Sequence, residues 1–254
     1  MITLMTDFST QDGYVGAMKG AIKSCSQSIE IIDITHDIKP YNTGQAAFTL
    51  LNYFSTFPDK TVHLCVVDPR VGSERAGLIV ETDKHYLVGP DNGIFDLVVA
   101  HKKCVCYKIN GNLFPGSSST FHGRDIFAPV AARICLGTSP VELGEQFKPK
   151  QTIKQKIQIK SSVITVHPIT YDRFGNIIFG IHKNELKLSK IKKIVFKHLE
   201  FNSISEYYAQ VPLGNYICIW NSSEYLEIAK YQGNACDTLV VDFNTDELKI
   251  FLEA

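Results

Sequence analysis

The sequence lacks the short motifs that identify several common classes of enzyme. It has no GxGxxG dinucleotide fingerprint, no GxxxxGK[ST] phosphate loop and no GxSxG nucleophile elbow. Histidine and cysteine spacings typical of zinc sites are missing, and so is an acidic loop with calcium spacing. The motifs therefore give no reason to expect a metal ion, a dinucleotide or a serine nucleophile.

An excess of charge of one sign and long hydrophobic runs are also lacking. Lysine plus arginine equals aspartate plus glutamate at 26 each, so the chain has no general attraction for nucleic acid or an anionic membrane. No segment approaches the ~18 apolar residues of a membrane span, and the start, MITLMTDF, lacks the basic region of a secretory signal. The seven cysteines are odd in number and include no CxxC pair. We therefore expect a protein of the reducing cytoplasm with neither a nucleic-acid nor a membrane partner.

The first half of the chain alternates apolar runs with segments of helical spacing. The runs at residues 1–5, 29–34 and 62–67 are expected to be strands, and residues 13–24, 44–55 and 123–137 are expected to be helices. Strands separated by helices favour a mainly parallel sheet, as in a Rossmann-like α/β domain. Residues 78–91 are interpreted as a hairpin that closes on the GPDNG segment.

The second half of the chain has a different composition and a different pattern of apolar residues. Residues 146–160 are rich in lysine and glutamine, and we place a linker at 149–158. Period-two alternation then predicts strands in VITVHPITY, KKIVFKHLEF, YICIW, TLVVDF and LKIFL. The sequence thus predicts an α/β fold with an N-terminal catalytic domain at 1–148 and a smaller, all-β, barrel-like domain at 159–254.

Polar residues gather where the apolar runs of the first half end. Asp7, Asp33 and Asp68 stand at or near such ends, and ligands of parallel sheets bind beyond the carboxyl ends of the strands. Taken singly, such residues are more often turn residues, helix caps or surface charges. Composition and spacing alone indicate only a two-domain enzyme or ligand-binding protein.

Longer motifs show what the sequence is similar to. ITLMTDF, DGYVGAMKG, IEIIDITHDI, VHLCVVDPRVGSER, GPDNGIF, TFHGRDIFAPVAA, YDRFGN and NSSEYLEIAKYQGNA follow one another along nearly the whole chain. With them the sequence resembles the S-adenosylmethionine hydroxide adenosyltransferases, relatives of the fluorinating and chlorinating enzymes. The resemblance implies that water or hydroxide attacks C5′ of the ribose of S-adenosylmethionine, giving adenosine and methionine. It also implies a homotrimer with active sites between subunits, and the chemistry requires no metal or other cofactor.

The same resemblance assigns residues to this reaction. Asp68, Arg75 and His122 match the catalytic set that holds and activates the attacking water. A second group is expected against the substrate: Asp7 on the ribose hydroxyls; Asp12, Asp172 and Ser222 at the methionine end; Asn176, Asn234 and Ala235 at the adenine; Phe8 and Tyr41 as aromatic walls; Phe174 and Glu227 on the substrate side without a specified role.

Two alternatives remain open at this point. A halogenase is disfavoured by His122-Gly123, because the halogenating relatives carry a tyrosine and a halide-binding serine there. A non-catalytic protein that binds S-adenosylmethionine or adenosine is disfavoured because the whole catalytic set is present.

The sequence also departs from the family pattern, at Arg70, Ala76, Glu224 and Phe179-Gly180. Of these, Arg70 and Glu224 are placed to alter the pocket. Family resemblance points to the (R)-sulfonium epimer, but the residues themselves decide neither the epimer nor which of Asp68 and His122 takes the proton.

Overall fold

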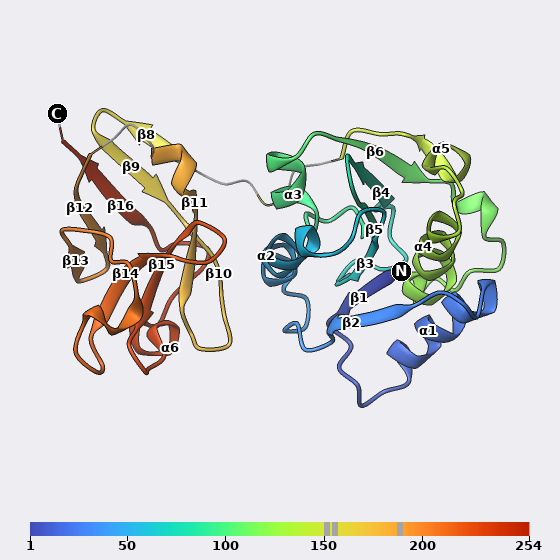
Figure 1. Ribbon diagram of the computed structural model, residues 1–254, viewed down its shortest axis with the longest axis horizontal. Coiled ribbons are helices and arrows are strands. Elements are labelled where there is room, and N and C mark those ends of the chain that lie inside the picture. The colour runs from blue at the N-terminus through green and yellow to red at the C-terminus, as the bar shows by residue number, and fades with distance from the viewer. Residues whose placement is uncertain (150–152, 154–156, 187–189, 254) are drawn as a thin grey trace. The chain divides into compact units, whose positions relative to one another are not determined.

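The chain forms two compact units, Met1–Ile153 and Lys154–Ala254 (Figure 1). The computed structural model describes residues 1–149, 153, 157–186 and 190–253. Much of the predicted linker at 149–158 lies outside the described residues. No helix among the residues described is long and apolar enough to cross a membrane.

The first unit is built on a seven-stranded mixed sheet with the strand order β2-β1-β3-β5-β4-β6-β7. Its strands are β1 (Ile2–Thr6), β2 (Ile31–Thr35), β3 (Val62–Val66), β4 (Gly77–Thr82), β5 (Tyr86–Pro90), β6 (Cys104–Ile109) and β7 (Gly144–Gln146). The pairs from β2 to β5 are parallel, and those from β5 through β4 and β6 to β7 are antiparallel. The α/β class is confirmed, but the expectation of a mainly parallel sheet is wrong for the half beyond β5.

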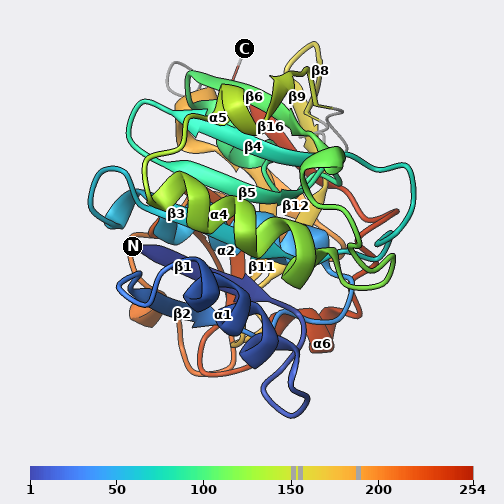
Figure 2. The same ribbon diagram turned by 90° about the vertical axis from the view of Figure 1, so that its right-hand side faces the viewer.

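Helices cover both faces of this sheet (Figure 2). α1 (Tyr14–Cys25) and α4 (Ala128–Cys135) pack together on one face, while α2 (Thr43–Tyr53) and α3 (Asp96–His101) pack on the other. β1 and β3 are therefore buried on both sides along their whole length, which explains why most of their residues are apolar.

The hairpin forms, but it turns at a different place from the one expected. The chain reverses between β4 and β5 at residues 83–85, where Thr82 Oγ1 accepts a hydrogen bond of 2.8 Å from the His85 amide. The first two residues of the GPDNG segment instead end β5, and its other three residues follow the strand. Because β5 is parallel to β3, this places Asn92 beside the end of β3, where its Nδ2 donates to the Val67 carbonyl at 2.7 Å.

The helix predicted at 123–137 has two parts. It starts with a π-helical turn, η3 (Gly123–Phe127), in which the Ala128 amide bonds to the Gly123 carbonyl five residues back, and it continues as α4. Gly137, at φ +99°, lies just beyond the helix end. The π-turn matters because single π-turns often occur at functional sites.

The second unit consists of two antiparallel sheets around a common core, with the orders β10-β11-β15-β14 and β13-β12-β16-β9-β8. The strands are β8 (Gln158–Lys160), β9 (Val163–Val166), β10 (Pro168–Tyr171), β11 (Ile177–His182), β12 (Ile191–Phe196), β13 (Leu199–Phe201), β14 (Tyr216–Trp220), β15 (Tyr225–Lys230) and β16 (Leu248–Leu252). Phe179 and Phe196 meet edge to face in the core at 5.0 Å between ring centroids.

One predicted strand of the second unit is wrong. TLVVDF begins inside a short helix, α6 (Ala235–Leu239), which ends where Val240 adopts the left-handed conformation with φ +48°. The Asn234 side chain caps this helix by accepting a bond of 2.9 Å from the Asp237 amide. The cap therefore overrides the β-branched pattern that follows it.

Candidate active site

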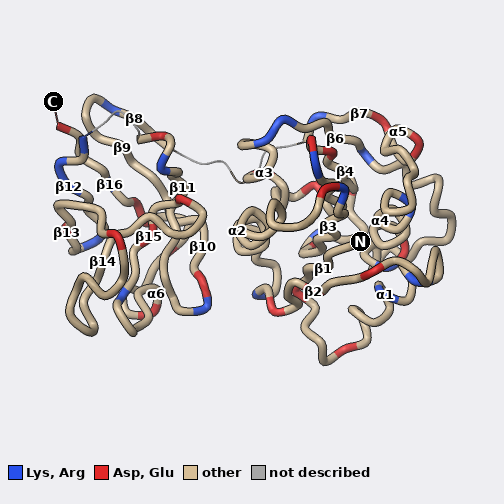
Figure 3. Tube along the Cα trace, in the orientation of Figure 1, with Lys and Arg blue, Asp and Glu red and all other residues tan. Residues whose placement is uncertain are grey.

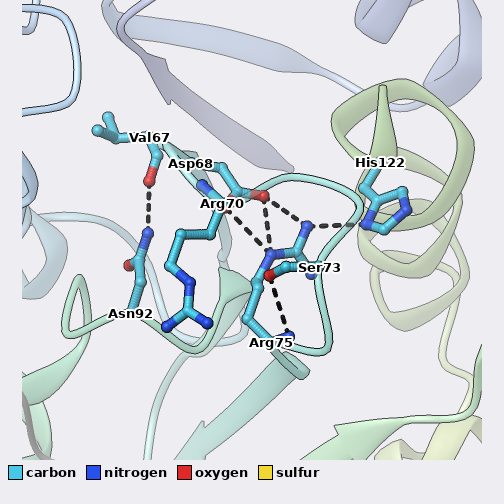
Figure 4. Close-up of polar contacts among 7 residues, drawn as sticks. All are labelled: Val67, Asp68, Arg70, Ser73, Arg75, Asn92 and His122. Carbon is cyan, nitrogen blue, oxygen red and sulfur yellow. Dashed lines mark hydrogen bonds and ion pairs between the residues drawn. The ribbon is translucent and has the colours of Figure 1, made fainter. Parts of the chain in front are cut away.

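Three side chains from two segments of the first unit form one hydrogen-bonded cluster (Figure 4). Asp68 follows β3, Arg75 precedes β4, and His122 precedes the π-turn. Arg75 Nε donates to the two Asp68 carboxylate oxygens at 3.1 and 2.9 Å, and Arg75 Nη2 lies 2.8 Å from His122 Nδ1. The side chains of Arg75 and Asp68 are only 4% and 5% exposed, so the ion pair is shielded from water.

The contact with Arg75 fixes where His122 carries its proton. A guanidinium group has only hydrogen-bond donors, so His122 Nδ1 must be the acceptor. The neutral ring then carries its proton on Nε2. Burial, followed by the charge of Arg75, lowers the pKa of His122 and so favours this neutral form.

The loop from Asp68 to Arg75 is packed directly against the segment that leads to His122. Gly72 has φ +77°, and a Cβ atom added there would lie 2.2 Å from the Ser119 carbonyl oxygen. Only glycine meets both conditions, the positive φ and the close approach. On the other side of the cluster, the Arg75 guanidinium lies over the Phe127 ring at 5.1 Å.

Asp7 faces the same site from the end of β1. The Tyr41 amide donates to Asp7 Oδ2 at 2.9 Å. Burial raises the pKa of Asp7, and the nearby charge of Asp68 raises it further. Tyr41 is exposed and has φ +68°. Asp7 thus lies close enough to the Asp68–Arg75–His122 cluster for the charge of Asp68 to act on it.

The other two candidates near the N-terminus differ from each other. Phe8 packs against Tyr14 and Phe121, with ring centroids 5.8 and 6.0 Å away. Asp12 is exposed in the loop before α1.

A pocket of about 660 Å³ opens in the second unit. Its lining includes four of the expected substrate residues: Asp172, Phe174, Asn176 and Asn234. The carboxylate of Asp172 accepts bonds of 2.9 Å from the amides of Phe174 and Asn176 and from the Asn176 side chain. Asp172 therefore holds the turn that presents Asn176, in addition to facing the pocket.

Tyr208 also lines this pocket and was missed by sequence reasoning. Its hydroxyl donates to Glu227 Oε1 at 2.8 Å, and Glu227 is only 3% exposed. Burial raises the pKa of Glu227 to about 7, and the charge of Asp172 adds to this effect. Tyr208 lies in a 3₁₀ segment with no recognisable motif, so only the tertiary contact with Glu227 reveals it.

Two further expected residues do not line the pocket. Ser222 is exposed in the turn before β15, and Ala235 is completely buried at the start of α6. In the part of the chain that the structure describes, no three His, Cys, Asp or Glu side chains form a group that could hold a metal ion. Acidic and basic residues are interspersed in both units (Figure 3).

Comparison with known proteins decides the family. The sequence model of the SAM hydroxide adenosyltransferase N-terminal domain matches residues 2–144, and that of the C-terminal domain matches residues 167–246. This chain belongs to the SAM hydroxide adenosyltransferase family. The four residues assigned to the ribose and the water, namely Asp7, Asp68, Arg75 and His122, all lie within the first match.

Individual relatives agree with the family. The chain is 40% identical to an (R)-S-adenosyl-L-methionine hydrolase of Methanocaldococcus jannaschii, over 98% of this chain and 95% of the relative. A fluorinase of Actinopolyspora mzabensis is 22% identical, over 74% of this chain and 73% of the relative. The crystal structure of an uncharacterised conserved protein from Thermotoga maritima superposes with a TM-score of 0.85 at 31% identity, covering 99% of this chain and 100% of that one.

Proposed function

We propose that this protein hydrolyses S-adenosyl-L-methionine to adenosine and L-methionine, with water or hydroxide attacking C5′ of the ribose. The Asp68–Arg75–His122 cluster carries the proposal, because the loop between β3 and β4 there meets the distant segment before the π-turn, and the donor and acceptor groups of the cluster are suited to holding a water molecule. A relative with 40% identity over nearly the full length is an (R)-S-adenosyl-L-methionine hydrolase. We therefore propose the (R)-epimer as the preferred substrate.

In this reaction it is the nucleophile, rather than the leaving group, that has to be activated. The leaving group is a neutral thioether, which departs without a general acid or a Lewis acid, and we propose that no cofactor takes part. Water, in contrast, must be aligned with C5′ and must lose a proton. A positioned base typically contributes about 10²–10⁴-fold, and alignment in a site from which bulk water is excluded contributes further.

The proton positions give the two water-holding residues different tasks. His122 Nδ1 accepts from Arg75, so its only other polar atom, Nε2–H, is a donor that can orient the water. To act as a base, His122 would have to take a proton on the nitrogen that faces the guanidinium. Asp68 already accepts from the Arg75 guanidinium and from the Arg70 amide, but its two carboxylate oxygens offer about four acceptor positions, so we assign the proton to Asp68. Arg75 holds both partners in place.

The residue after His122 supports water rather than halide as the nucleophile. A Cβ atom added to Gly123 would lie 3.3 Å from Met18 Sδ and 3.4 Å from Phe121 Cε2. The serine that halogenating relatives carry here would need its neighbours to move. The site therefore has little room for the halide-binding side chain.

The remaining proposed contacts belong to both units. Asp7 would accept hydrogen bonds from the two ribose hydroxyls, while the second-unit pocket would hold the adenine between Phe174, Asn176 and Asn234. Asp12, Asp172 and Ser222 remain our proposal for the methionine end. We further propose an N-terminal catalytic domain at 1–148, a C-terminal β-barrel-like domain at 159–254 and a homotrimer that shares its active sites.

The location also remains a proposal. We place the protein in the cytoplasm, which the seven free cysteines support.

Incubation with each separated sulfonium epimer in ¹⁸O-water tests the reaction. We expect adenosine labelled at O5′ together with methionine, faster from the (R)-epimer, and unaffected by EDTA or by chloride and fluoride. A halogenated nucleoside would identify a halogenase. Tight binding without turnover would identify a binding protein, and unlabelled adenosine would exclude attack by water at C5′.

A further inference from the structure

A buried network lies behind the turn that carries Asp7, and none of its members belongs to the proposed catalytic or substrate-binding set. His36 directly follows β2 and is 5% exposed, and its Nδ1 lies 2.8 Å from Oγ1 of Thr6, the last residue of β1. On its other side, His36 Nε2 lies 3.2 Å from Asp33 Oδ1, close enough for charge attraction but without the alignment of a hydrogen bond. Lys19 Nζ holds the second Asp33 oxygen at 2.5 Å.

The charges in this network set the direction of its hydrogen bonds. The carboxylate of Asp33 favours a proton on His36 Nε2, which leaves Nδ1 as the acceptor of the Thr6 hydroxyl proton. Thr6 Oγ1 is then free to accept from the Phe8 amide, which lies 3.2 Å away. The bonds from the Phe8 amide to Thr6 and from the Thr6 hydroxyl to His36 then point the same way, so each strengthens the other.

Both residues after Asp7 are tied to this network. The Phe8 amide donates to Thr6 Oγ1, and the Ser9 amide donates to the carbonyl oxygen of His36 at 2.8 Å. Ser9 has φ +54°, a conformation that a non-glycine residue adopts only when its surroundings impose it. His36 thus contacts the turn through its side chain and its backbone.

We infer that His36 is a positioning residue that fixes the Asp7 turn, so that the Asp7 carboxylate is already oriented when the ribose arrives. The inference rests on the proposed role of Asp7. One carboxylate that accepts from two adjacent hydroxyls needs a defined orientation. A mobile turn would have to be ordered each time a ligand binds, and the entropy cost of that ordering would weaken binding. From the other side, the Tyr41 amide holds Asp7 Oδ2.

The same strand offers a matched control. His63 on β3 pairs with Thr3 on β1 through an Nδ1–Oγ1 distance of 2.8 Å, and both residues are fully buried. This Thr–His pair has the same chemistry as Thr6–His36, but it lies near the opposite end of β1 from Asp7. If a substitution acts only through lost packing, the His36 and His63 variants should therefore show similar effects. If it acts through the orientation of the Asp7 turn, only the His36 variants should show the effect.

Ligand discrimination tests the inference in the full chain. The dissociation constants of adenosine and 2′,3′-dideoxyadenosine, which lacks both ribose hydroxyls, are measured by calorimetry for the wild type and for His36→Ala, His36→Asn and His63→Ala. We expect the preference for adenosine to fall about tenfold in His36→Ala and to stay unchanged in His63→Ala. His36→Asn should retain part of it, because its amide oxygen can accept from Thr6. An unchanged preference in His36→Ala, or an equal loss in His63→Ala, would overturn the inference.

Hydrogen exchange separates this inference from the proposed function. The amides of Phe8 and Ser9 should exchange faster in His36→Ala and at the wild-type rate in His63→Ala. If the wild type does not prefer adenosine, or if Asp7→Asn keeps the preference, the ribose role of Asp7 is wrong. The exchange rates would still show whether His36 fixes the turn, and unchanged protection of both amides in His36→Ala would refute that claim directly.

Discussion

At the scale of single residues, Arg75 gives unequal roles to the two side chains that it contacts. Its donors occupy Nδ1 of His122, which leaves the neutral ring only an N–H donor, whereas the carboxylate of Asp68 stays a hydrogen-bond acceptor although Arg75 donates to both of its oxygens. The roles can therefore be separated by substitutions that preserve shape.

Asp68→Asn should lower kcat by about 10²–10⁴-fold, because an amide cannot accept the proton of the water. His122→Gln should cost about tenfold, because glutamine supplies both an acceptor for Arg75 and an N–H donor. The substrate Kd should change little in either variant, since these interactions are made mainly in the transition state. Single-turnover rates and directly measured Kd values check this, and an equal or larger loss in His122→Gln would assign the proton to His122.

The buried carboxyl of Glu227 makes a prediction about stability. Its pKa is raised from 4.5 to about 7, so the folded state favours the protonated form. The contribution of protonated Glu227 to the free energy of unfolding is therefore fully present below pH 4.5. It is lost as the pH rises through about 7, which lowers the free energy of unfolding by roughly 3 kcal/mol. Glu227→Gln should therefore gain stability relative to the wild type as the pH rises from 4.5 to 8. Urea denaturation across this range measures the difference, and a constant difference would contradict the assigned burial.

At the scale of elements, the buried start of β3 predicts a sensitivity to acid. His63 is fully buried and packs at 5.2 Å from the His85 ring, and burial, followed by the neighbouring His85, lowers the pKa of His63 to about 3. The unfolded chain takes up a proton near pH 6.5, so stability is complete above that pH and is lost as the pH falls towards 3.

The loss attributable to His63 should reach about 2 kcal/mol at pH 5. His63→Gln should be less stable at pH 7, because it packs less well, but should lose less stability between pH 7 and pH 5. Denaturation midpoints at the two pH values give the comparison. Parallel losses in wild type and variant would show that other groups cause the acid sensitivity.

The elements also show where sequence information ends. Runs buried on both faces, such as β1 and β3, were predictable because all their residues except Thr3, Thr6 and His63 are apolar. The strands β6 and β7 were not, because the inner strand β6 alternates buried and exposed residues irregularly and the edge strand β7 has only three residues. The place of the hairpin turn depended on a threonine side chain rather than on glycine and proline, and α6 depended on its asparagine cap.

The candidate site likewise contains residues that the sequence could identify and residues that it could not. Motifs identified Asp68, Arg75 and His122, and the structure joins them through hydrogen bonds. Sequence spacing could not reveal Tyr208 or His36, because each acts through a partner from a distant segment, Glu227 and Thr6 respectively. The direction of the Arg75–His122 bond also required coordinates, and it is what distinguishes a base from a donor.

At the scale of the whole molecule, the proposed substrate contacts are divided between two units that fold around separate cores. Asp7 and the catalytic cluster belong to the first unit, and Phe174, Asn176 and Asn234 belong to the pocket of the second. Neither unit alone holds a complete set of contacts. The proposed homotrimer would complete each active site with residues from two chains in a ring of head-to-tail interfaces.

Mixing inactive chains tests this sharing. His122→Ala removes a first-unit residue and Asn176→Ala a second-unit residue, so each homo-oligomer should be nearly inactive. In a trimer assembled at random from equal amounts of both chains, about one quarter of the shared sites would combine two intact halves. Co-expression should therefore restore about a quarter of the wild-type rate, in a particle whose mass corresponds to three chains of 28.4 kDa.

The matched control combines two first-unit variants, His122→Ala and Asp68→Ala. Whether or not active sites are shared between chains, every site in that mixture contains an altered Asp68–Arg75–His122 cluster. The activity of the mixture should therefore stay at the level of the single variants. Native mass spectrometry must show mixed trimers in both preparations, which removes failed exchange as an explanation. If mixed trimers of His122→Ala with Asn176→Ala are present and inactive, each active site is built from one chain, and the two units of that chain must meet around the substrate.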